Sequence, residues 1–146
     1  MDVFVYGTLT DPERAASVLG ADGFAYRGDA VLDGLHCIAG TYPTLAPGGT
    51  AVGRLLRVDG ASGTGETSET GGTGGIDVLD RYEGVERGLY VRVSVPLVDE
   101  SGTVEIYVGD PDTLDVREPV EWPGSGAFGE RVRRYVREHS VVVRRE

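Results

Sequence analysis

The segment 76–83 holds the acidic residue whose type and spacing best suit proton-transfer chemistry. At about 100° per residue of a helix, Glu83 falls between Ile76 and Leu79 on the apolar face. A carboxylate aimed at the core must be paired with a base, be hydrogen-bonded, or face a pocket with a raised pKa. In the last case a glutamate, whose pKa is ordinarily ~4.3, could shuttle protons near neutral pH. Glu83 is therefore the first candidate for a catalytic residue.

Two alternatives stay open around this helix. Asp80 lies at the edge of the same apolar face, which makes it the rival acid. Glu83 could also form a salt bridge with Arg87 or Arg92 that does no more than anchor the following loop. These alternatives differ in where the carboxylate of Glu83 points.

A second candidate feature is the turn formed by residues 6–9, Tyr-Gly-Thr-Leu. The preceding residues 2–6 are typical of a buried strand, and Asp11-Pro12 is typical of a helix start. A glycine turn between a strand and a helix exposes consecutive backbone N–H groups, which suits an anion or a developing oxyanion. The alternative is an ordinary tight turn.

Composition excludes several classes of catalyst. All 14 basic residues are arginine, against 24 acidic residues and a net charge of −10. Without lysine there is no Walker-type phosphate loop and no Schiff-base site. One cysteine and two histidines give no disulfide and no basis for a zinc centre, so we expect no metal and no cofactor. The acidic balance disfavours nucleic acid and anionic membranes as partners.

The same balance of charges favours an acidic surface adapted to high salt. No apolar run approaches the ~20 residues of a membrane span, and no basic-then-apolar leader opens the chain. We therefore expect a cytoplasmic protein. The oligomeric state stays open, with a monomer as the simplest case.

The length of 146 residues suits a single domain covering 1–146. Strands outnumber helices and short turns join them, so we expect an α+β fold with a small barrel or strongly curled sheet. Turns are expected at Asp33-Gly34 and at 46–49, and Cys37 is expected to be a buried apolar residue. The expected strands are 2–6, 24–32, 35–39, 51–58, 89–97 and 103–108, and the expected helices are 12–19, 76–83 and 126–138.

Two segments depart from this pattern. Residues 60–75 contain seven glycines and almost nothing apolar, which predicts a flexible surface insertion. Residues 130–146 contain six arginines and three acids, so the helix and basic tail at 126–146 carry positive charge. Either this helix docks on the acidic body of its own chain, or it contacts a partner.

Five segments, in order, resemble the γ-glutamylcyclotransferase-like family, which includes the AIG2-type proteins. They are Val-Phe-Val-Tyr-Gly-Thr-Leu at 3–9, Tyr-Pro-Thr-Leu at 42–45, Val-Gly-Arg-Leu at 52–55, Leu-Asp-Arg-Tyr-Glu-Gly at 79–84 with Tyr-Val-Arg at 90–92, and the strand at 103–108. The resemblance covers residues 2–110. It implies a barrel-like fold of about six strands in a mixed, curled sheet with flanking short helices.

The resemblance also implies a function and a set of site residues. The family's reaction cyclises a γ-glutamyl amine or peptide to 5-oxoproline and releases the amine, without a cofactor. Glu83 matches the catalytic glutamate of the family. The residues implied to bind or surround this small-molecule substrate are Tyr6, Gly7, Thr8, Leu9, Tyr42, Pro43, Tyr90 and Arg92.

Two other functions compete with this one. A non-catalytic module could hold a small metabolite or a peptide end in the same pocket, since a fold does not settle a function. An interaction protein could act through the basic C-terminal helix. The first is distinguished by whether Glu83 faces an open pocket or is locked against Arg92.

Overall fold

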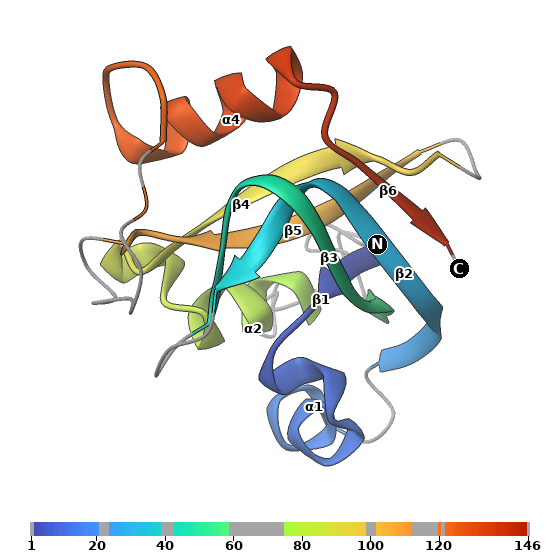
Figure 1. Cartoon of the computed structure of the whole chain (residues 1–146). Helices are drawn as coiled ribbons and strands as arrows, with labels where there is room; N and C mark the ends of the chain where they lie inside the picture. The colour runs from blue at the N-terminus through green and yellow to red at the C-terminus, as the bar shows by residue number, and fades with distance from the viewer. Residues whose placement is uncertain are drawn as a thin grey trace.

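The computed structural model describes residues 2–20, 24–38, 43–58, 75–98, 102–111, 120 and 122–145. Its centre is one mixed, curled sheet of six strands in the order β4-β5-β1-β3-β2-β6 (Figure 1). The predicted α+β architecture with a curled six-stranded sheet is confirmed. The strands are β1 (Asp2–Val5), β2 (Phe24–Ile38), β3 (Thr44–Val58), β4 (Tyr90–Pro96), β5 (Thr103–Gly109) and β6 (Val142–Arg145).

The helices divide between the two faces of the sheet. Apolar residues of α1 (Pro12–Leu19) and α2 (Gly75–Tyr82) join one core cluster, and those of α4 (Phe128–Glu138) join the other (Figure 1). Short 3-10 turns, η1 (Thr8–Thr10) and η3 (Val85–Arg87), follow β1 and α2. The ends of α1 are the predicted ones: the Asp11 side chain accepts from the Glu13 N–H, and Gly20 closes the helix.

The two long strands correct the expected turns. The pairing of β2 with β3 runs without a break from Phe24–Val58 to Ile38–Thr44, so no loop separates 24–32 from 35–39 and none lies at 46–49. Gly34 and Gly48 have φ of 109° and 92°, and the register shifts between the Asp33 and Leu35 pairs. The glycines permit a bulge where the sequence predicted two turns. Cys37, expected to be buried, is exposed on β2.

Strand β6 was not predicted, and it partly closes the sheet. It pairs antiparallel with β2, at one edge of the sheet. At the opposite edge, Leu97 forms a bridge with Val143, and the Val98 N–H donates to the Val143 carbonyl at 2.8 Å. The two edges of the curled sheet therefore meet at this point. Val132 and Val136 of α4 are buried in the same core cluster as Leu97 and Val143.

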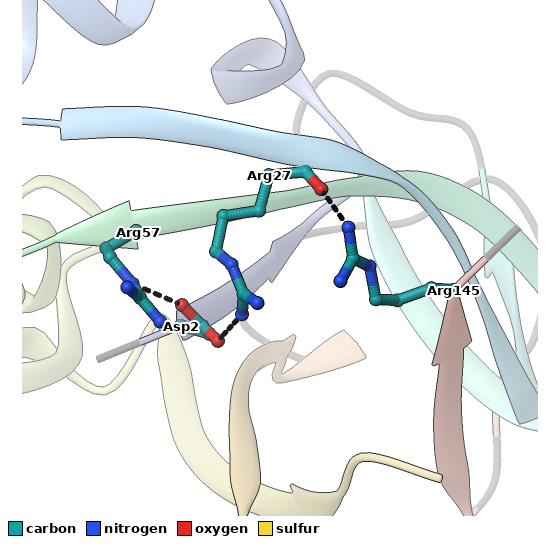
Figure 2. Close-up of polar contacts among 4 residues, drawn as sticks. All are labelled: Asp2, Arg27, Arg57 and Arg145. Atoms are coloured by element: carbon teal, nitrogen blue, oxygen red, sulfur yellow. Dashed lines mark hydrogen bonds and ion pairs between the residues drawn. The ribbon is translucent and has the colours of Figure 1, made fainter. Parts of the chain in front are cut away.

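A charge cluster ties the central strand β1 to β3 and, beyond it, to β2. The carboxylate of Asp2 lies between the guanidinium groups of Arg27 and Arg57, with the Arg57 Nε 3.2 Å from Asp2 Oδ1 (Figure 2). Arg145 of β6 donates to the carbonyl of Arg27 at 2.9 Å. The Asp2 side chain is only 10% exposed, so salt screens this cluster less than it screens exposed pairs. These contacts fix the strand from which residues 6–9 extend.

Residues 60–74 of the expected insertion and Tyr42 lie outside the described residues. Among the helices that are described, none combines the length and apolar character needed to cross a membrane.

Gly53 provides a test of the packing of β3 against β1. A Cβ at this position would lie 2.2 Å from the Val5 carbonyl oxygen and 2.9 Å from the Phe4 ring. The backbone cannot move without breaking the β1–β3 pairing, so Gly53→Ala should lower the free energy of unfolding by at least about 2 kcal/mol. Urea unfolding measures this loss.

Gly129→Ala is the matched control. Its added Cβ would meet mainly the mobile end of Arg133, and alanine favours the helix. This variant should unfold at the same or higher urea concentration than the wild type. Equal stability of the Gly53→Ala variant and the wild type would contradict the packing described here.

Candidate functional site

A cavity of about 550 Å³ opens beside the turn that follows β1. Residues from the end of α2, from η3 and from strands β4 and β5 complete its wall. Its lining residues are Phe4, Val5, Tyr6, Gly7, Leu9, Arg14, Pro43, Tyr82, Glu83, Arg87, Leu89, Tyr90 and Tyr107.

Glu83 reaches this cavity through the packing of α2. Ile76 and Leu79 are fully buried against the sheet. The Glu83 N–H donates to the Leu79 carbonyl at 2.8 Å, so the helical hydrogen-bond pattern extends through Glu83. Gly84, with φ of 73°, then ends the turn. Glu83 thus follows the buried face of the helix, and its side chain lines the cavity.

The environment of Glu83 favours its neutral form. Burial raises the pKa of its carboxyl from 4.5 to about 7. In the part of the chain that the structure describes, no arginine forms an ion pair with this carboxylate. A carboxyl with this pKa is present in both protonation states near neutral pH, as a proton shuttle requires.

Asp80, the rival acid, is held by partners on the sheet. Arg92 Nε lies 3.0 Å from Asp80 Oδ1, and the Tyr107 hydroxyl donates to the same oxygen at 2.7 Å. Arg92 also pairs with Glu105 at 3.1 Å. Arg92 is therefore not locked against Glu83, and it does not line the cavity. It attaches α2 to strands β4 and β5.

The turn after β1 lines the cavity through Gly7 and Leu9. The first hydrogen bond of the turn runs from the Thr10 N–H to the Gly7 carbonyl at 3.1 Å, and the Thr10 hydroxyl donates to the same carbonyl at 2.7 Å. The N–H groups of Gly7, Thr8 and Leu9 precede that bond, so no hydrogen bond within the turn uses them. Tyr26 donates to the Leu9 carbonyl at 2.6 Å and holds the turn in place. The side chain of Thr8 lies outside the described residues.

Tyrosine hydroxyl groups fix two further walls. Tyr6 donates to the Tyr107 carbonyl at 2.5 Å, and Tyr90 donates to the Pro43 carbonyl at 2.6 Å. Pro43 in turn packs beside Gly7. Burial, reinforced by the nearby Tyr90 and Glu83, raises the pKa of the Tyr6 hydroxyl well above its ordinary value. Tyr6 therefore stays protonated and acts as a donor.

The structure adds Arg14, Arg87 and Tyr107 to the residues predicted from the sequence. Tyr107 could have been found, because strand alternation puts it on the same face as Glu105. The sequence named Arg87 only as a possible partner of Glu83 and gave no signal for Arg14, because the two arginines belong to different helical turns that meet only in the folded chain. In the described part of the chain, no three His, Cys, Asp or Glu side chains gather as a metal site would require.

Comparisons with known proteins identify a family and a fold. A family model described as "Gamma-glutamyl cyclotransferase, AIG2-like" matches residues 3–124. No curated protein matches the sequence. A solved structure named gamma-glutamyl cyclotransferase has 15% identity and a TM-score of 0.51, with 94% of this chain and 98% of that chain covered.

Two other solved structures are similar over most of their length. Protein ytfP from Escherichia coli is 24% identical, with a TM-score of 0.50 and coverage of 84% of this chain and 96% of that one. An uncharacterized protein from Homo sapiens, loc79017, is 16% identical, with a TM-score of 0.50 and coverage of 91% and 97%. At these identities the likeness concerns the fold.

The raised pKa of Glu83 predicts a pH-dependent cost to stability. Below about pH 4.5 the carboxyl is protonated in both the folded and the unfolded chain. Between about pH 4.5 and 7, the carboxyl ionises in the unfolded chain while it stays largely protonated in the folded chain. The free energy of unfolding therefore falls by up to about 3 kcal/mol over this range. The Glu83→Gln variant should therefore have the same free energy of unfolding as the wild type near pH 4. Near pH 8 its free energy of unfolding should be higher than that of the wild type by up to about 3 kcal/mol.

Urea unfolding at a series of pH values measures this difference. Glu86→Gln is the matched control, because Glu86 is exposed on η3 and does not line the cavity. A difference between Glu83→Gln and the wild type that stays constant across the pH range would refute burial of an ionisable carboxyl at this position.

Proposed function

The chain belongs to the gamma-glutamyl cyclotransferase, AIG2-like family, and on this premise we propose that it is a cyclotransferase that uses Glu83 as its general acid and base. The proposed substrate is a γ-glutamyl amine or peptide, and the products are 5-oxoproline and the free amine. One observation carries this proposal. Glu83 lines the cavity with a pKa of about 7, while Arg92 is engaged by Asp80 and Glu105.

The proposed reaction takes place within one substrate molecule. The α-amine attacks the γ-carbonyl carbon, which forms the ring C–N bond, and the bond to the leaving nitrogen then breaks. Glu83 takes one proton from the ammonium group before the attack and a second from the ring nitrogen after it. It passes each to the leaving nitrogen, which departs as an ammonium ion, a role worth ~10²–10⁴ in rate. Nucleophile and electrophile are already joined, so the pocket has mainly to hold the substrate in its attack geometry.

The turn after β1 suits the charge that develops in this reaction. The γ-carbonyl oxygen becomes negative as the amine attacks. We assign the N–H groups of Gly7, Thr8 and Leu9 to this oxygen or to the α-carboxylate of the substrate. The Tyr26 contact with Leu9 and the contact of Pro43 with Gly7 support this assignment, because both hold the turn before substrate binds.

The walls of the cavity also favour an anionic substrate. Arg14 and Arg87 line it, and among the described lining residues Glu83 is the one acid. In the described part of the chain, neither arginine forms an ion pair with a carboxylate. Because the chain as a whole carries a charge of −10, these two guanidinium groups supply a local attraction for the substrate carboxylate. We assign them to substrate binding rather than to proton transfer.

Replacing Glu83 tests the proposed chemistry. Glu83→Gln keeps the shape of the side chain and removes proton transfer, so release of 5-oxoproline should fall at least ~10²-fold. In the wild type, kcat/KM should rise with pH through about 7 as Glu83 ionises. The assay offers γ-glutamyl amino acids and γ-glutamyl amines and detects 5-oxoproline.

Glu86→Gln, which removes an exposed acid three residues away, should keep wild-type activity. Equal rates for the wild type and Glu83→Gln would exclude the proposed proton shuttle. Saturable binding of γ-glutamyl compounds with no 5-oxoproline from any of them would instead identify a non-catalytic binding module.

Replacing Arg87 tests the binding assignment. Arg87→Gln should raise KM about tenfold, the worth of one charge-assisted hydrogen bond, and change kcat much less. Arg81→Gln, which removes an exposed arginine that does not line the cavity, is the matched control and should leave KM unchanged. An equal rise in KM for both variants would show a general charge effect.

A further inference from the structure

A second cavity, of about 660 Å³, lies between strand β4 and helix α4. None of its described lining residues also lines the cavity that holds Glu83. Its walls come from β4, from the last turns of α4 and from residues 140–142, which lead into β6. It therefore lies beside the edge strand β4, which α4 and residues 140–142 face.

This cavity is cationic in a strongly acidic protein. Arg92, Arg133 and Arg137 line it, and no acidic residue is among the described residues of its lining. Arg92 is neutralised by its ion pairs with Asp80 and Glu105. Arg133 and Arg137 form no ion pair with any carboxylate in the described parts of the chain. Two arginine side chains without an ion-pair partner among the described residues therefore line one cavity, and the guanidinium group of Arg133 reaches back along the helix towards Gly129.

The two arginines repel each other in the absence of a ligand. They stand four residues apart on α4, about 6 Å along the helix axis. Like charges at this spacing destabilise a helix by a few tenths of a kcal/mol, and an anion between them would reverse the sign of that interaction. Among the described residues, neither Glu130 nor Glu138 forms an ion pair with Arg133 or Arg137.

The turn after α4 adds a hydroxyl group at a conformational cost. Ser140 lines the cavity with φ of 51°, in the left-handed position after a helix where glycine is the usual residue. Glycine would fit this backbone better but would have no hydroxyl. In the last turn of the helix, the Tyr135 and Val136 carbonyls already accept from the His139 and Val141 N–H groups.

Buried valines form the apolar part of the cavity. Val93, Val136 and Val141 are at most 7% exposed, and all three belong to one core cluster. We infer that this cavity binds a small dianion, held by Arg133 and Arg137, with Ser140 as a further donor. A short dicarboxylate and inorganic phosphate share this chemistry and are separated by experiment.

Calorimetric titration of the full chain with glutarate, with inorganic phosphate and with butyrate tests the inference, at a constant ionic strength of about 0.1 M. At least one of the two dianions should bind saturably, and the monoanion butyrate should bind at least tenfold more weakly or not at all. Stronger binding of glutarate than of phosphate would indicate a dicarboxylate site, and the reverse a phosphate site.

Variants locate the binding. Arg133→Gln and Arg137→Gln should each weaken it about tenfold. Arg134→Gln removes the same charge from the same helix outside the cavity, and should leave the affinity within about twofold. Ser140→Gly should raise the melting temperature of the free protein and yet weaken binding, which a merely structural serine would not do.

Three results would overturn the inference. The first is the absence of saturable binding for both dianions. The second is an equal loss of affinity in Arg134→Gln and Arg137→Gln. The third is unchanged affinity in Ser140→Gly, in Arg133→Gln and in Arg137→Gln. None of these measurements depends on cyclotransferase activity, so they test the inference independently of the proposed function.

Discussion

Burial of Ile76 and Leu79 beneath the sheet is the interaction on which the candidate site depends. Both side chains are fully buried, and the helical pattern extends through Glu83, so the same packing carries the Glu83 carboxylate into the cavity. Burying two aliphatic side chains yields roughly 3–6 kcal/mol. That exceeds the cost of about 3 kcal/mol for ionising one buried carboxyl at neutral pH. Hydrophobic packing thus maintains a group that would be unstable in isolation.

The same packing explains why two neighbouring acids differ. Asp80 lies over the charged patch made by Arg92 and Glu105, where the Tyr107 hydroxyl also reaches it. Glu83 lies less than one turn further along the helix, beyond the reach of that patch. One acid thereby becomes part of an ion network, and the other keeps a carboxyl that can exchange protons. The difference arises from their angular positions on one short helix, since both residues are acids of similar length.

Local features could be predicted from the sequence, whereas features made by distant pairings could not. The ends of α1 follow from Asp11 and Gly20, and the phase of Glu83 follows from Ile76 and Leu79, because a few neighbouring residues decide each. The continuous β2–β3 pairing across Gly34 depends on contacts between strands, whereas the local sequence at Asp33-Gly34 favours a turn. Strand β6 was missed for the same reason. The meeting of Arg14 and Arg87 at one cavity also requires the complete fold.

The central position of β1 has a consequence for how the chain folds. Asp2 pairs with Val104 of the parallel strand β5. Residues near the start of the sequence therefore pair with residues about a hundred positions later. Closing so long a loop costs entropy before any contact rewards it, and folds rich in such pairings form slowly. Tyr6, just after β1, is likewise anchored by the Tyr107 carbonyl. The turn that lines the cavity is therefore held in place by residues about a hundred positions away in the sequence.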